Sequence, residues 1–141
     1  MRIVGKLSLR DRIFQIVSAR VWKGRDLWNL EFETQQEEYD GESWSPVLYH
    51  QGLSINADSV EELSGTTIQW KTKNDGDYSH PEIAMMYVFG HHDVRNCVLS
   101  FGSISDGRIE ITWLGECDVF WDDEYKDNVP FSLVCHVAAD L

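Results

Sequence analysis

The sequence predicts an all-β protein, with the strands arranged as an antiparallel sandwich, jelly roll or barrel. Apolar residues alternate with polar ones along much of the chain, which is the period of a half-buried strand. Turn signals rich in Gly, Asn and Asp separate these runs at short intervals, and short connections favour antiparallel neighbours. The pattern yields about nine to ten strands and at most one short helix. The 141 residues are expected to form a single domain, residues 1–141, with one core.

The N-terminal part predicts a strand followed by a long hairpin. Residues 3–9 alternate apolar with polar side chains and carry a basic outer face. Residues 13–22 and 27–34 are rich in β-branched and aromatic types, and residues 23–26 supply the turn between them. The second arm of the hairpin is expected to bury Trp28, Leu30 and Phe32.

The middle of the chain predicts shorter elements. Residues 35–43 are polar and acidic and are expected to form a loop. Residues 44–49 resume as a strand that Pro46 places at an edge or at a strand start, and residues 53–55 form a short strand after Gly52. Residues 58–63 predict a single helical turn. Its expected cap is Asp58 or Ser59, and its expected end is Gly65.

Two further strands are expected before the C-terminal region. Residues 66–73 alternate polar and apolar side chains, and a turn follows at residues 74–77. Residues 83–89 are apolar at both odd-numbered and even-numbered positions, which is typical of a central strand that is covered on both faces. Residues 90–93 are expected to form the loop to the next hairpin.

The C-terminal stretch, residues 97–136, predicts a hairpin that closes at Ser105-Asp106-Gly107, because Asp-Gly supplies the positive φ of a tight turn. Gly115 interrupts the second arm, which indicates a bulge or a close backbone approach. An acidic aromatic loop is expected at residues 121–125, and Pro130 is expected to open the last strand.

Net charge restricts the partners. The chain carries a formal charge of −12, divided between about +6 in residues 1–25 and −18 in residues 26–141. The strongly acidic residues 26–141 repel phosphate backbones, which argues against binding to nucleic acid. The three cysteines fit no metal or redox spacing and are expected to be reduced and buried. No long apolar run occurs, so we expect no membrane association and a cytoplasmic location.

No catalytic motif is present, and the sequence predicts no enzyme activity, no catalytic residues, no cofactor and no metal site. His91, His92 and Asp93 are adjacent along an extended segment, where neighbouring side chains point to opposite sides. The carboxylates of residues 118–127 do not match a calcium loop. A carboxylate pair such as Asp118 and Glu124, or His136 beside a thiol, would act only if a cleft brought the groups together.

The six tryptophans suggest an alternative function, a β-sandwich that binds a carbohydrate or another small ligand by aromatic stacking. Trp28, Trp70 and Trp113 lie in alternating strand patterns and are expected in the core. The other three lie next to turns or loops and are expected to be exposed; they are Trp22, Trp44 and Trp121.

The preferred interpretation is a non-enzymatic binding protein with a basic protein as partner. Two segments combine aromatic side chains, which anchor interfaces, with carboxylates that complement lysine and arginine. The expected partner-binding residues are Asp118, Trp121, Asp122, Asp123, Glu124, Tyr125, Asp127, Glu37, Glu38, Tyr39 and Asp40. The sequence also allows a homodimer. In size and acidity the chain resembles bacterial immunity proteins, which implies an inhibitor of a basic toxin such as a nuclease.

Overall fold

The computed structural model describes residues 4–10, 12–24, 26–39, 41–53, 55–70, 84–87, 91–121 and 124–138. An antiparallel sheet accounts for most of them and confirms the all-β class. Its principal strands are β1 (Val4–Leu9), β2 (Arg12–Gly24), β3 (Leu27–Thr34), β6 (Val47–Leu53), β8 (Ala84–Tyr87), β9 (His91–Ser105), β10 (Arg108–Trp121) and β11 (Glu124–Ala138).

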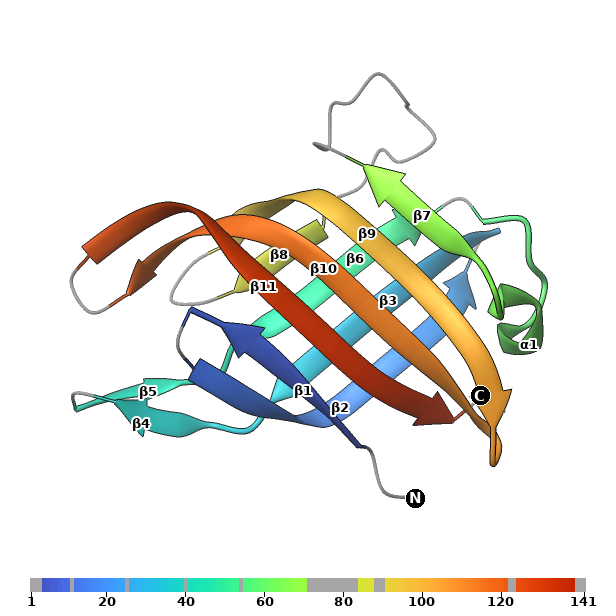
Figure 1. Cartoon of the computed structure of the whole chain (residues 1–141), viewed down its shortest axis with the longest axis horizontal. Helices are drawn as coiled ribbons and strands as arrows, with labels where there is room; N and C mark the ends of the chain where they lie inside the picture. The colour runs from blue at the N-terminus through green and yellow to red at the C-terminus, as the bar shows by residue number, and fades with distance from the viewer. Residues whose placement is uncertain are drawn as a thin grey trace.

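These eight strands form a ring in which each strand pairs with its neighbours along the chain. The order is β1-β2-β3-β6-β8-β9-β10-β11, and β11 pairs again with β1. The curled sheet therefore closes on itself as an up-and-down barrel, one of the three architectures that the sequence allowed. In Figure 1, β9, β10 and β11 lie in front and cross over β2, β3 and β6 behind them.

Four smaller elements lie outside this ring. Strand β7 (Thr67–Trp70) pairs with β9, and β4 (Glu37–Tyr39) pairs with β5 (Glu42–Trp44) as a separate hairpin. Helix α1 (Val60–Leu63) begins at the predicted cap, where the Ser59 hydroxyl accepts a hydrogen bond from the backbone N–H of Glu62 at 3.3 Å. Within the described ranges no helix is long and apolar enough to cross a membrane.

Several expected boundaries are wrong. Residues 35–43 were expected as a loop, but they include β4 and most of β5; His91 was expected in a loop, but it begins β9. Trp44 ends β5 rather than starting the next strand, and β6 runs through Gly52. These segments lack clear apolar alternation, and their strand form depends on pairing with a neighbouring strand.

Pro130 also departs from expectation, because β11 begins six residues earlier, at Glu124. Pro130 pairs with Glu116 of β10, whereas the pairing of β11 with β1 ends at Phe131, opposite Leu9. Pro130 therefore lies where β11 has a partner on one side only. A residue without a backbone N–H is tolerated there, because one side of the strand has no ladder to complete.

Aromatic side chains fill the interior around Trp113, which is fully buried. Its ring centroid lies 6.4 Å from that of Phe32, 6.3 Å from that of Phe131 and 6.5 Å from that of His50. Trp28 is also buried, as predicted, and Trp22 is 37% exposed, as predicted. Trp44 was expected to be exposed, but it is 2% exposed and belongs to the same core.

The predicted C-terminal hairpin is confirmed. Ser105 pairs with Arg108, and both turn residues have positive φ, 54° at Asp106 and 73° at Gly107. Both alternatives expected at Gly115, a bulge and a close backbone approach, are confirmed. The register between β9 and β10 shifts between Leu114 and Glu116, and the backbone approaches its neighbours closely.

Gly115→Ala is expected to lower the free energy of unfolding by about 1–3 kcal/mol, the usual cost of overpacking. A Cβ atom at this position would lie 2.8 Å from the Phe131 ring and 2.9 Å from Cys97 Sγ. Gly24→Ala is the control, since its Cβ would meet only Asn29 Nδ2 at 3.8 Å. Urea unfolding of both variants is the measurement, and equal midpoints would contradict the prediction.

Candidate protein-binding site

The alternating direction of the ring strands assigns every connection to one of two ends. The connections β1–β2, β3–β6, β8–β9 and β10–β11 lie at one end, because successive strands run in opposite directions. The β4–β5 hairpin belongs to the second of these connections. Figure 1 shows it at the left, together with the tip of β10 and β11, whereas α1 and the β9–β10 turn lie at the right. We call the left end the acidic end.

The first acidic segment forms the β4–β5 hairpin. Glu37 is half-buried and Glu38 is exposed on β4, Tyr39 is the last residue of that strand, and Asp40 lies outside the described residues. Glu37 pairs in register with Trp44, whose buried indole anchors the hairpin in the core. The predicted loop is therefore a short ribbon that presents Glu38 to solvent.

Hydrogen bonds fix the base of this hairpin to the barrel. The Ser45 hydroxyl donates to the carbonyl oxygen of Thr34 at 2.9 Å, and the Thr34 hydroxyl donates to the carbonyl oxygen of Pro46 at 2.7 Å. The backbone N–H of Gln35 donates to the carbonyl oxygen of Gln15 on β2 at 2.8 Å. With these contacts the hairpin is held at both of its ends, which limits the entropy that a partner must remove on binding.

The second acidic segment is the tip of β10 and β11. Trp121 pairs with Glu124 and Phe120 pairs with Tyr125, so the expected loop at residues 121–125 is mostly strand. Asp122 and Asp123 lie outside the described residues, and they alone separate the two strands. Asp127 belongs to β11. The sequence missed this hairpin because the acidic residues obscure the alternation of apolar side chains.

Asp118, expected as a partner-binding residue, lies at the base of this hairpin and not at its tip. It lies at a bulge. Cys117 pairs with Val129 and Val119 pairs with Lys126, so the single residue Asp118 on β10 faces two residues, Asp127 and Asn128, on β11. Its carboxylate accepts hydrogen bonds from the Arg95 guanidinium and from the backbone N–H of Asn128, the latter at 2.9 Å. Arg95 Nε donates to the Asn128 side-chain oxygen at 3.0 Å. These contacts make Asp118 a residue that positions the hairpin.

Asp118→Asn is expected to lower the free energy of unfolding by about 1–2 kcal/mol, because the Asp118 carboxylate is only 26% exposed and binds both the Arg95 guanidinium and the backbone N–H of Asn128. Asp58→Asn is the matched control. It removes the same charge from a pair with Lys23, joined at 2.9 Å, in which the Asp58 side chain is 89% exposed. Chemical denaturation should show little change in this control. Equal losses in the two variants would argue against the assigned role of Asp118.

Nucleophilic or metal-binding chemistry finds little support elsewhere. Burial raises the pKa of each cysteine thiol to about 12, at Cys97, Cys117 and Cys135. Thiols with so high a pKa are poor nucleophiles. Among the residues that the structure describes, no group of three or more His, Cys, Asp or Glu could hold a metal ion. His136 Nε2 lies 3.4 Å from Glu110 Oε2 on the outer face.

Comparison with protein-family models, curated proteins and solved structures gave no match. The two acidic segments are about 80 residues apart in the sequence, and both lie at the acidic end. They lie on opposite sides of the ring, one between β3 and β6 and the other between β10 and β11.

Proposed function

We propose that this protein is a non-enzymatic binding protein whose acidic end binds a basic protein. The observation that carries the proposal is the placement of both acidic hairpins at one end of the barrel. Residues 37–42 contain four carboxylates and no base, and residues 122–127 contain four carboxylates and one lysine. Two acidic segments on one end favour a basic partner and speed its encounter.

Cations elsewhere in the chain do not cancel this charge. At the same end, residues 10–12 add two arginines and one aspartate, so the acidic residues remain in excess. Lys23 pairs with Asp58 beside α1, at the opposite end, and Arg20 pairs with Glu31. Two bases of the N-terminal region, Arg20 and Lys23, are thus paired with carboxylates outside the two acidic hairpins.

The finer proposal is an immunity-type inhibitor that covers the basic active site of an effector such as a toxin nuclease. Tyr39, Trp121 and Tyr125 provide aromatic residues among the carboxylates of both hairpins. Aromatic anchors surrounded by charge are typical of tight interfaces. The alternative of a carbohydrate or small-ligand site has weaker support, because Phe32, Trp113 and Phe131 fill the interior where a barrel of this kind would hold a ligand.

Glu38→Lys is expected to weaken the complex about tenfold or more, because it places a cation against a basic partner. Glu61→Lys on α1 is the matched control, with the same change of charge at an exposed position on the opposite end. Proteins of the native host are captured on each tagged variant and eluted with rising salt. A basic protein that wild type and Glu61→Lys retain, and that Glu38→Lys loses, is the expected result.

Trp121→Ala tests the aromatic anchor in the same experiment and should abolish retention while far-ultraviolet circular dichroism stays native. If the captured protein binds Glu38→Lys and Trp121→Ala as tightly as wild type, the acidic end is not its binding site. If nothing basic is retained by the wild-type protein at low salt, the proposal of a basic partner is wrong.

A further inference from the structure

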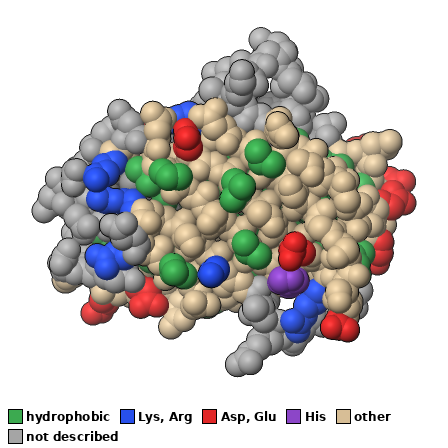
Figure 2. Space-filling view, viewed as in Figure 1, with side chains coloured by type: hydrophobic (Ala, Val, Ile, Leu, Met, Phe, Trp, Pro, Cys, Tyr) green, Lys and Arg blue, Asp and Glu red, His purple; other side chains and the backbone are tan. Residues whose placement is uncertain are grey.

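Large apolar side chains remain exposed on one outer face of the barrel. Ile13 and Val17 on β2 are 55% and 53% exposed, Leu114 on β10 is 46% exposed, and Val134 on β11 is 36% exposed. Strands with one solvated face normally carry polar side chains there. In Figure 2 hydrophobic side chains are scattered over the viewed face, where β9, β10, β11 and β1 lie in front. We call the outer surface of β10, β11, β1 and β2 the apolar face.

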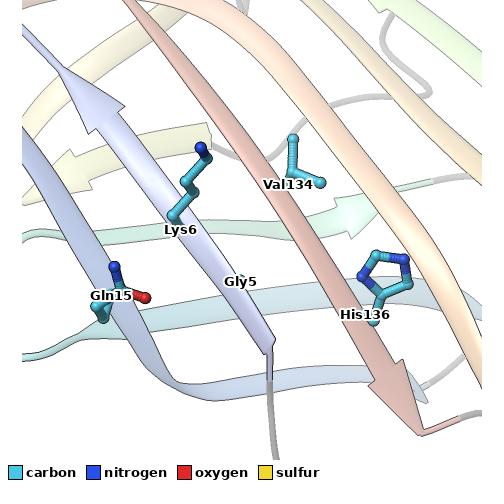
Figure 3. A pocket seen from close by; sticks show the side chains of 5 residues that line it. All are labelled: Gly5, Lys6, Gln15, Val134 and His136. Atoms are coloured by element: carbon cyan, nitrogen blue, oxygen red, sulfur yellow. The ribbon is translucent and has the colours of Figure 1, made fainter.

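Strand register gives this face a ridge on each side and a shallow middle. Ile13 on β2 pairs with Ser8 on β1, Ser8 pairs with Ser132 on β11, and Ser132 pairs with Leu114 on β10. Two small serines thus separate two large apolar side chains. Beside them is a hollow of about 200 Å³, lined by Gly5, Lys6, Gln15, Val134 and His136 (Figure 3).

The charged side chains on this face differ between its β1 side and its β10 side. The exposed Lys6 lies on β1, and Arg10 follows the end of that strand. Glu110 and Glu116 lie on β10, two strands away. Strand β10 also carries one base, Arg108, on this face. The β1 side of the face is therefore basic and the β10 side has an excess of acid, with apolar side chains on both.

We infer that a second copy of this chain docks on the apolar face to form a symmetric dimer. A two-fold axis running along the strands near β1 and β11 lays the β1–β2 half of each copy over the β10–β11 half of the other. Ile13 then approaches the Leu114 of the partner copy, and Lys6 approaches the region of its Glu110. A partner that repeats the same pattern in reverse satisfies both halves at once.

Association by this face does not need a free strand edge. Strands β1 and β10 pair on both sides over most of their length, whereas β2 pairs with β1 only through residues 12–15 and with β3 only through residues 16–24. Two sheets can instead pack face to face, about 10 Å apart, as in sandwich folds. This surface is separate from the acidic end, so the inference does not depend on the proposed function.

Sedimentation equilibrium of the full chain, from about 5 μM to about 500 μM, tests the inference. Wild type is expected to dimerise reversibly over this range. Leu114→Glu should weaken the dimer at least tenfold. Gln69→Glu adds the same charge at an exposed position on β7 and should leave the dimer unchanged. Leu114→Ser gives the same readout if the glutamate variant fails to fold.

Exchanging the charges of Lys6 and Glu110 tests how the two copies are oriented in the dimer. Lys6→Glu alone and Glu110→Lys alone should each weaken the dimer several-fold, whereas the double variant should restore it. A wild-type chain that stays monomeric at about 500 μM, or a dimer that Leu114→Glu leaves unchanged, would overturn the inference. A double variant as weak as the single ones would overturn the opposed arrangement of the two halves.

Discussion

Trp113→Ala is expected to lower the free energy of unfolding by about 3–5 kcal/mol, the range for truncation of a large buried aromatic side chain. The indole is fully buried between Phe32 and Phe131, both packed edge to face against it, with His50 on another side. These three neighbours come from β3, β6 and β11, so the cluster joins them to β10, the strand of Trp113. Because they are fixed by the sheet, they cannot collapse fully into the space that alanine leaves.

Urea unfolding with tryptophan fluorescence and circular dichroism measures this loss, and the midpoint should fall with little change in slope. Trp22→Ala is the control. Trp22 lies on β2 with 37% exposure, and the Arg20 guanidinium carbon sits 4.9 Å from its ring centroid. Its removal should cost about 1 kcal/mol or less. A loss at Trp113 no larger than the loss at Trp22 would show that the aromatic cluster does not support the barrel.

The long hairpins could be predicted from sequence because two independent signals agree there. Ile109, Ile111 and Trp113 alternate with polar residues, and Asp106-Gly107 provides the only turn chemistry that fits the gap before them. All three apolar side chains are buried, as this pattern predicts. The same agreement of alternation and turn residues defines β2 and β3.

The short acidic strands could not be predicted in this way. Residues 37–39 and 42–44 contain three carboxylates and no apolar alternation, and they pair because Trp44 anchors one arm in the core. Trp121 and Glu124 likewise belong to strands through the ladder that begins at Arg108 and Ala138. In each case pairing with a neighbouring strand outweighs local propensity.

The placement of both acidic segments at one end depends on the parity of the strands between them. Four ring strands, β6, β8, β9 and β10, separate the β4–β5 hairpin from the β10–β11 tip, and an even number returns the chain to the same end. The sequence alone cannot give this count. Strand β7 has the same alternating pattern as a ring strand, and counting it would move the two segments to opposite ends.

The three cysteines are expected to resist alkylation in the folded protein. Desolvation is the largest cause of the raised pKa at each, about 12 against the ordinary value of 9.0. At pH 8 the thiolate fraction is then roughly a thousandfold lower than in the unfolded chain. A thiol reagent should react with three groups in denaturant and very slowly without it. Equally fast reaction in both states would show that the thiols are not buried.

The same thiols should make the protein lose stability at high pH. A raised folded-state pKa means that the unfolded chain releases its thiol protons first, so the stabilisation is fully present below about pH 9 and is lost as the pH rises toward about 12. Three thiols together correspond to a slope of up to about 4 kcal/mol per pH unit in that interval. Cys135→Ala removes one of them and should reduce the slope by about a third in urea unfolding between pH 9 and pH 11. A slope that the variant leaves unchanged would mean that another group governs the alkaline transition.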